Sequence, residues 1–168
     1  MTITEIATLE LLVPHTWDSP DARTFFRTLS DRQSAWSGHS LFFFKGADSP
    51  GQIFLISGWK SVQTHNEWIA SAQNQGLLEM TKGLVEVRGL VHADINFEDL
   101  PRGTRRIVVE VIQKGGGGEA STKLQKTRSV EEDERHEWAA SGEVLDGGAG
   151  AICRLRAYAM GETDLLSY

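Results

Sequence analysis

Two residues on one predicted helix are the first candidates for chemistry. His65 and Trp68 lie three positions apart after an apolar, strand-like run, so their side chains are neighbours on the helix surface. An imidazole titrates near neutral pH and can act as an acid or a base, and an indole ring offers a flat face for stacking. The spacing therefore predicts one wall of a substrate pocket. The alternative is a histidine packed under the sheet whose ring nitrogens bond to the backbone.

A second pair, His92 and Asp94, falls on the last strand of the predicted N-terminal unit. Residues two positions apart on a strand share a face, and a carboxylate beside an imidazole can orient it or share a proton with it. We predict His92 with Asp94 as the proton-transfer pair, facing a cavity between two sheets. His65, with Trp68, then has the substrate-positioning role; the two histidines need not touch and are expected at opposite ends of one cavity. If this face of the strand is in solvent, the pair is an ordinary polar strand end.

Two further aromatic residues complete the predicted pocket. Phe43 lies in the aromatic run LFFF, and Trp59 lies at the exit of the central strand. We assign Trp68, Trp59 and Phe43 to substrate binding, with Trp59 as a packing anchor rather than a catalyst.

The sequence shows no constellation typical of a metal, haem or flavin site. The five histidines are scattered along the chain: His15, His39, His65, His92 and His136. No pair of them has the close spacing of a zinc motif. The glycine runs at residues 115–118 and 147–150 lack the helix start and lysine of a phosphate loop, and both are predicted to be turns. Cys153 lies in a strand-like run and is predicted to be buried filler. We therefore predict no cofactor and no metal.

Residues 1–100 are predicted to form one α+β unit that positions these side chains. The predicted strands cover residues 3–13, 41–45, 53–56 and 89–97, and the helices follow Ser19 and Ser61, with a break at residues 74–76 and a further helical piece at residues 77–85. The order β-α-β-β-α-β is that of a ferredoxin-like split βαβ unit, whose helices cover one face of the sheet. The opposite face is rich in apolar side chains and needs a partner, which predicts a homodimer.

Residues 101–168 are predicted to form a β-rich C-terminal extension. Its strands are expected at residues 105–113, 142–145 and 151–159, the last two as a hairpin around residues 146–148. Residues 115–135 are glycine-rich and charged, which predicts a flexible loop. The segment EWAAS at residues 137–141 echoes EWIAS at residues 67–71, which suggests a shortened second copy of the unit. Chance similarity is the alternative.

Composition narrows the class of protein. The chain has 168 residues, 40% of them hydrophobic and 24% charged, as in a globular domain. The net charge of −6 disfavours nucleic acid as a partner, and no apolar run approaches the roughly 20 residues of a membrane span. One cysteine and an acidic start without a basic signal region predict a cytoplasmic protein.

Four segments carry a resemblance to a known family. ITEIATLELL, LFFF, ISGWKSVQTHNEWIAS and GLVHADI, spread over residues 3–97, resemble the antibiotic-biosynthesis-monooxygenase-like family of the dimeric α+β barrel superfamily. The likeness is densest between Trp59 and Trp68. It implies two ferredoxin-like sheets packed face to face, usually in a homodimer.

The same resemblance informs the chemistry. Relatives that degrade haem carry a haem-ligating histidine ten residues after the tryptophan that matches Trp68, and that position is Leu78 here. Relatives that oxidise polyketide phenols without a cofactor use an asparagine four residues before that tryptophan, and that position is Thr64 here. We expect a cofactor-independent tailoring enzyme of secondary metabolism, of monooxygenase, cyclase or isomerase type, acting on an aromatic or polyketide-like small molecule. The competing hypothesis is a non-catalytic ligand-binding or stress-related protein of the same fold.

Overall fold

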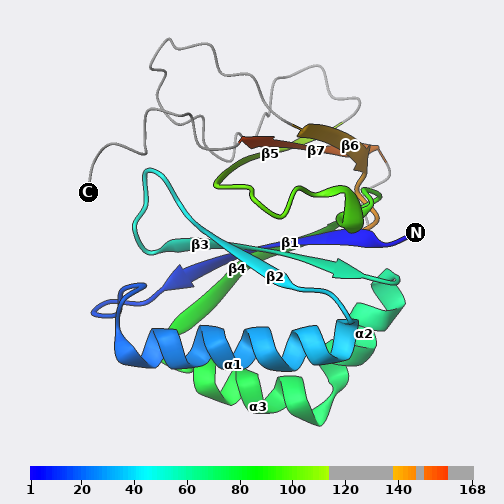
Figure 1. Cartoon of the computed structure of the whole chain (residues 1–168). Helices are drawn as coiled ribbons and strands as arrows, with labels where there is room; N and C mark the ends of the chain where they lie inside the picture. Colours follow the sequence, from blue (N-terminus) through cyan, green and yellow to red (C-terminus); the bar gives the residue numbers. More distant parts are fainter. Residues whose placement is uncertain (114–137, 147–149, 159–168) are drawn as a thin grey trace.

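The computed structural model describes residues 1–113, 138–146 and 150–158. The N-terminal unit consists of β1 (Ile3–Leu11), α1 (Pro20–Ser37), β2 (Leu41–Lys45), β3 (Gln52–Trp59), α2 (Val62–Ala70), α3 (Ala72–Thr81) and β4 (Val85–Ala93). Its four strands form an antiparallel sheet in the order β2-β3-β1-β4, and the three helices lie on one face of it (Figure 1). This arrangement confirms the predicted ferredoxin-like unit.

The helix ends follow the local sequence signals. Pro20 occupies the first helical position of α1, where its missing N–H costs nothing, and Gly38 ends the helix in the left-handed region at φ 79°. The hydroxyl of Ser61 accepts a hydrogen bond from the N–H of Thr64 at the start of α2. These starts and stops fix the direction in which α1 and α2 leave the sheet.

Two predicted boundaries were wrong. The helical break falls at Ser71, whose hydroxyl caps α3 by accepting from the N–H of Asn74, so residues 74–76 lie inside that helix. The turn after α3 contains Gly83 at φ 74°, and β4 therefore begins at Val85 and ends at Ala93. A short 3₁₀ helix, η1 (Phe97–Asp99), occupies residues that were predicted to end the strand.

Apolar side chains from α1, α2 and α3 pack on the helix-side face of the sheet. Strand alternation gives this face its members from β1, namely Ala7, Leu9 and Leu11. From α1 come the buried stripe residues Ala22, Phe25, Phe26 and Leu29. Glu5 lies on the same face of β1 as these leucines, and it is also buried.

A second antiparallel sheet covers the opposite face. It consists of β5 (Arg106–Gln113), β6 (Trp138–Glu143) and β7 (Ala151–Tyr158), in the order β5-β7-β6 (Figure 1). Ile6 and Ile56 of the first sheet share one core with Cys153 and Leu155 of the second. The apolar face that motivated the homodimer prediction is thus covered within the chain. The homodimer stays a prediction that rests on the family resemblance.

One edge of the two sheets is joined by backbone hydrogen bonds. The N–H of Asp94 donates to the carbonyl of Glu143 at 2.8 Å, and the N–H of Leu145 donates to the carbonyl of His92 at 2.8 Å. Gly142 permits this approach, because a Cβ there would lie 2.0 Å from the carbonyl oxygen of Asp94. The segment that follows β6 therefore runs beside the end of β4, through an isolated antiparallel bridge between Ala93 and Val144.

The second sheet has the topology of the first three strands of the first sheet. The order β6-β7-β5 corresponds to β2-β3-β1, with the same antiparallel pairings. The EWIAS–EWAAS echo does not support this match, because residues 67–70 of its first copy lie on α2 whereas residues 138–141 of its second lie in β6. A shortened second copy of the unit stays a prediction, now supported by topology rather than by that echo. The predicted flexible loop at residues 115–135 lies outside the described residues. None of the helices in the described part of the chain is both long and apolar enough to cross a membrane.

Candidate functional site

A cavity of about 220 Å³ lies between the first sheet and its helices. Most of its wall is apolar, and Trp68, Leu77 and Leu90 are among the residues that line it. Three of the large hydrophobic side chains that are exposed to solvent also line it: Ile69 at 38%, Leu78 at 39% and Val87 at 53%. Exposed apolar side chains grouped at one cavity are typical of a binding site for an apolar molecule.

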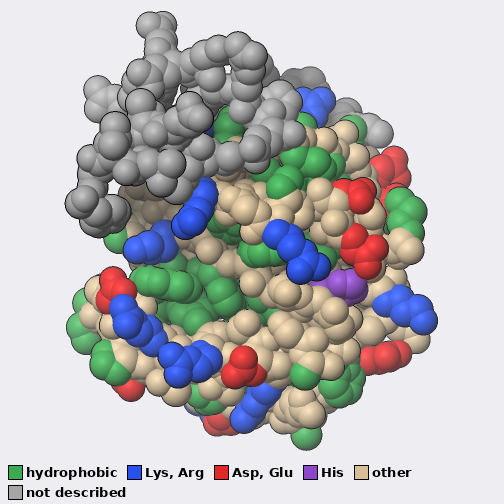
Figure 2. Space-filling view, in the orientation of Figure 1, with side chains coloured by type: hydrophobic (Ala, Val, Ile, Leu, Met, Phe, Trp, Pro, Cys, Tyr) green, Lys and Arg blue, Asp and Glu red, His purple; other side chains and the backbone are tan. Residues whose placement is uncertain are grey.

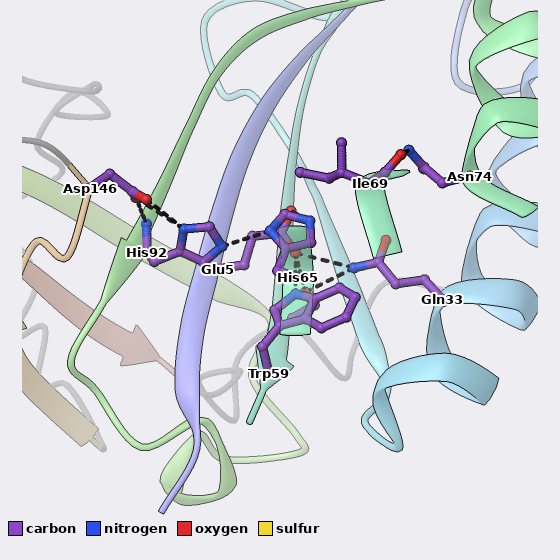
Figure 3. A network of polar contacts seen from close by, with 9 residues as sticks. Glu5, Gln33, Trp59, His65, Ile69, Asn74, His92 and Asp146 are labelled. Atoms are coloured by element: carbon purple, nitrogen blue, oxygen red, sulfur yellow. Dashed lines mark hydrogen bonds and ion pairs between the residues drawn. The ribbon is translucent and has the colours of Figure 1, made fainter. Parts of the chain in front are cut away.

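Glu5 and His65 provide a polar end to this cavity. The Glu5 side chain is 4% exposed, and its Oε2 accepts hydrogen bonds from Ser57 Oγ at 2.6 Å and from Trp59 Nε1 at 2.6 Å. Gln33 Nε2, on α1, donates to the same oxygen at 3.2 Å (Figure 3). These donors stabilise a buried carboxylate that would otherwise be costly. They also hold its other oxygen, Oε1, at 3.6 Å from His65 Nε2.

The pairing of the strands places these groups in one row. Glu5 pairs with Ser57 across β1 and β3, and with His92 across β1 and β4. His65 lies over this row from α2, with its ring stacked on Trp59 at a centroid distance of 4.4 Å and an interplanar angle of 30°. The sheet therefore fixes three members of the site, and α2 adds the fourth.

The two histidines are in direct contact. His65 Nδ1 and His92 Nε2 are 2.6 Å apart, and both residues are buried, at 3% and 1% exposure (Figure 3). On its other side, His92 Nδ1 lies 2.8 Å from Asp146 Oδ1, and the backbone N–H of His92 donates to Asp146 Oδ2. Asp146, from the segment that follows β6, is one-third exposed. The result is a continuous chain of groups, Asp146–His92–His65–Glu5, that runs from the surface to the cavity.

Burial lowers the pKa of His65 below its ordinary value, because removing an imidazolium from water is costly. The negative charge of Glu5 opposes this effect, while a positive charge on His92 would add to it. A lowered pKa keeps His65 neutral near pH 7, which is the form that can act as a base.

The structure corrects the predicted proton-transfer pair. Asp94 lies beyond the end of β4 and is exposed, so it does not orient His92; Asp146 does. His92 also reaches the helix side of the sheet, where it meets His65, rather than a cavity between the sheets. The expectation that the two histidines serve separate places was therefore wrong.

The predicted binding residues divide among three environments. Trp68 is buried and lines the cavity together with His65, and its role in substrate binding stays a prediction. Trp59 is fully buried and holds Glu5 and His65, so it is a packing anchor and not part of the cavity wall. Phe43 lies away from the histidines and packs on Phe26 and Trp17.

Phe43 lines a second, larger cavity of about 440 Å³. Its wall includes Phe44 and Phe54 from the first sheet and Val109 from the second, and the exposed cations Lys45 and Arg105 also line it. On the face of the molecule seen in Figure 2, hydrophobic side chains gather on the left and are bordered by Lys and Arg side chains. We refer to the two spaces as the helix-side cavity and the inter-sheet cavity.

Sequence reasoning missed Glu5, Gln33 and Asp146. The first two carried a signal, because Glu5 shares a strand face with leucines and Gln33 shares a helix face with phenylalanines, and a polar residue on an apolar face is informative. Asp146 carried none, since 54 positions separate it from His92 and only the joining of the two sheets brings them together.

The described residues contain no group of three or more histidine, cysteine or acidic side chains arranged to hold a metal ion. His65 and His92 form a hydrogen bond with each other. Leu78, at the position of the haem-ligating histidine of some relatives, lines the helix-side cavity.

Comparison with known proteins gives likeness at the level of structure. No protein-family model matches the sequence, and a search of the curated proteins gave no match. A crystal structure from Lactobacillus acidophilus NCFM, provisionally described as a monooxygenase, aligns with a TM-score of 0.51 at 15% identity over 94% of this chain and 77% of its own. A provisionally described chlorite dismutase aligns with a TM-score of 0.53 at 10% identity over 95% of this chain and 80% of its own.

A third structure, from Chloroflexus aurantiacus J-10-fl, is provisionally described as an antibiotic biosynthesis monooxygenase. It aligns with a TM-score of 0.43 at 13% identity over 55% of this chain and 90% of its own. The two alignments with the higher TM-scores extend over nearly the whole chain and therefore include both sheets. The chain therefore shares the fold of these two structures, a ferredoxin-like α+β unit with a second antiparallel sheet packed on it.

Proposed function

We propose that this protein is a cofactor-independent enzyme that binds an aromatic or polyketide-like small molecule in the helix-side cavity and removes a proton from it with His65. The reaction is of monooxygenase, cyclase or isomerase type, as in a tailoring step of secondary metabolism. The descriptions of the structural neighbours as monooxygenases agree with an enzymatic role.

One observation carries the proposal: a buried histidine with a lowered pKa lies at the polar end of an otherwise apolar cavity. Its Nδ1 is bonded to His92, and its Nε2 faces Glu5 Oε1 at 3.6 Å. That separation is longer than a hydrogen bond, so Nε2 is not strongly engaged. A neutral imidazole beside a buried carboxylate is suited to take up a proton, because the carboxylate stabilises the imidazolium that forms.

The cavity indicates the class of substrate. Its volume of about 220 Å³ is below the roughly 300–1,000 Å³ of most ligand pockets, which favours a one- or two-ring molecule. Trp68 provides an aromatic wall, and the carbonyl or hydroxyl of a phenolic or diketone substrate would lie toward Glu5 and His65.

Proton removal accounts for each of the proposed reaction types. The broken C–H or O–H bond leaves its electron pair on the substrate, and the proton forms an N–H bond at His65 Nε2. In a cyclase, that electron pair attacks a carbonyl carbon of the same molecule. In an isomerase, the proton returns to a different carbon of the substrate and forms a new C–H bond there. In a monooxygenase, the electrons of the substrate anion reduce molecular oxygen. The first step is the same in all three cases, and the protein's own residues suffice for it.

Turnover tests the proposal. Naphthoresorcinol, resacetophenone and benzoylacetone are aromatic probes with acidic hydrogens, and their C–H exchange in deuterated water can be followed by NMR beside oxygen uptake and product formation. We expect the wild-type protein to accelerate exchange of at least one probe, and His65→Gln to lower that rate by about 10² to 10⁴, the usual share of one general base. His15→Gln is the matched control, because His15 does not line the cavity, and it should keep the wild-type rate. Probe binding without any acceleration would instead support the non-catalytic ligand-binding protein.

A further inference from the structure

We propose that Asp146 is a positioning residue that, through His92, determines which ring nitrogen of His65 is free to receive the substrate proton. The proposal rests on the proposed function of His65 and adds the outer half of a proton relay. It also gives the C-terminal region, whose segment after β6 supplies Asp146, a direct role in a site that otherwise belongs to the N-terminal unit.

Asp146 contacts His92 through both of its carboxylate oxygens. Asp146 Oδ2 accepts from the backbone N–H of His92 and lies 3.1 Å from His92 Nδ1, while Oδ1 lies closer to that nitrogen, at 2.8 Å. An ionised carboxylate can only accept, so Nδ1 of His92 carries the hydrogen. β4 is an edge strand, so on the side that faces away from β1 no strand of its own sheet competes for this backbone N–H.

The position of that hydrogen fixes the tautomers of both rings. Neutral His92 with its hydrogen on Nδ1 has a bare Nε2, which can only accept. The 2.6 Å contact therefore requires His65 to donate from Nδ1. Neutral His65 then has a bare Nε2, and this is the nitrogen that faces Glu5 at the cavity.

The same contacts provide a path for the proton. When a substrate C–H or O–H bond breaks, its electron pair stays on the substrate and an N–H bond forms at His65 Nε2. The hydrogen on His65 Nδ1 can then pass to His92 Nε2, so one N–H bond breaks as the other forms. The positive charge moves to His92, beside Asp146, and the path works equally in reverse. The charged and titratable groups in contact with the two rings are Glu5, from β1, and Asp146.

Asp146→Asn is an informative substitution because an amide has only one oxygen. The backbone N–H of His92 is always a donor and retains that oxygen, so the NH₂ group takes the nearer position, 2.8 Å from His92 Nδ1, where two N–H groups would oppose each other. This favours a bare Nδ1 on His92, even though the retained oxygen position lies 3.1 Å away. His92 then carries its hydrogen on Nε2, and His65 carries its own on Nε2, toward the cavity. A neutral His65 in this state has no free lone pair for the substrate. A similar aspartate-to-asparagine change in the serine protease triad leaves the geometry intact but fixes the wrong tautomer.

The experiment compares Asp146→Asn with Asp94→Asn, which removes an exposed carboxylate two residues from His92. NMR of labelled histidine nitrogens reports the tautomers without any ligand, and naphthoresorcinol exchange reports the rate. We expect Asp146→Asn to move the hydrogen of His65 from Nδ1 to Nε2 and to lower the rate by about 10² or more, the loss of a working general base. Asp94→Asn should retain the wild-type tautomers and rate.

Two outcomes would overturn the inference. One is an unchanged His65 tautomer in Asp146→Asn, and the other is a changed tautomer with the wild-type rate while His65→Gln is impaired. Failure of the proposed function has a different signature, since His65→Gln would then keep the wild-type rate whatever the tautomers show. Circular dichroism and the Asp146→Glu variant, which keeps both acceptor oxygens and should restore the wild-type tautomer, separate a positioning effect from loss of folding.

Discussion

The inter-sheet cavity and the helix-side cavity differ in what their walls can do. The inter-sheet cavity is the larger, at about 440 Å³, and its aromatic wall carries charge on exposed side chains such as Lys45 and Arg105. The helix-side cavity is half that size, at about 220 Å³, but it ends on the buried groups Glu5 and His65. Volume thus points to one cavity and chemistry to the other. Titratable groups held out of water, rather than size, mark the candidate site.

Filling each cavity with a bulky side chain gives the largest expected contrast. Leu78→Trp should obstruct the helix-side cavity, because the larger side chain would occupy space that the substrate needs. We expect it to lower kcat/KM for naphthoresorcinol by at least about 100-fold. Ile107→Trp places the same side chain in the inter-sheet cavity, and its kcat/KM should stay near the wild-type value. Steady-state kinetics measure both. Equal losses in the two variants would remove the distinction between the cavities.

Stability should also differ between the two regions. Trp59→Phe removes the indole N–H that donates to Glu5 Oε2 at 2.6 Å, and we expect a loss of about 1–3 kcal/mol in the free energy of unfolding, the cost of an under-satisfied buried group. Phe44→Leu, on the half-buried wall of the inter-sheet cavity, should cost about 1 kcal/mol, as is common for point substitutions. Urea titration compares the two, and a smaller loss for Trp59→Phe would show that the polar row is not held as tightly as its distances indicate.

The pH dependence of stability sharpens the comparison further. The pKa of His65 is lowered in the folded protein, so between that value and its unfolded pKa near 6.5 the unfolded chain binds more protons. Stability should therefore fall as the pH drops below about 6.5, by at most about 1.4 kcal/mol per pH unit for this one group. The difference between wild type and His65→Gln in urea titrations from pH 7 to pH 5 isolates the effect. A difference that does not change with pH would contradict the lowered pKa.

The sequence predicted the fold better than it predicted the site. The alternation in β1 placed Glu5 on one face with Ala7 and Leu9. The signals at Pro20 and Ser61 correctly predicted where α1 and α2 begin. These features depend on neighbouring residues, and local rules describe them well. The start of α3 was predicted wrongly because Ser71 was not considered as a helix cap. Ser71 ends α2 and also caps the N-terminus of α3.

The site depends on pairings that local rules do not reach. Asp94 was chosen as the partner of His92 because it is close in sequence, but β4 ends before it. Asp146 takes its place because the segment after β6 lies beside β4, and that register is set by the packing of one sheet on the other. His65 and His92 meet for a similar reason, since the position of α2 over the sheet follows from its packing against β3 and α1.

A crystal structure of His65→Gln soaked with the probe that the wild-type protein turns over would test the central claim most directly. The account predicts that the ligand occupies the helix-side cavity, stacked on Trp68, with its acidic hydrogen within about 3 Å of the place of His65 Nε2, the reach of a general base. A ligand in the inter-sheet cavity, against Phe43 and Phe44, with the helix-side cavity empty, would contradict it.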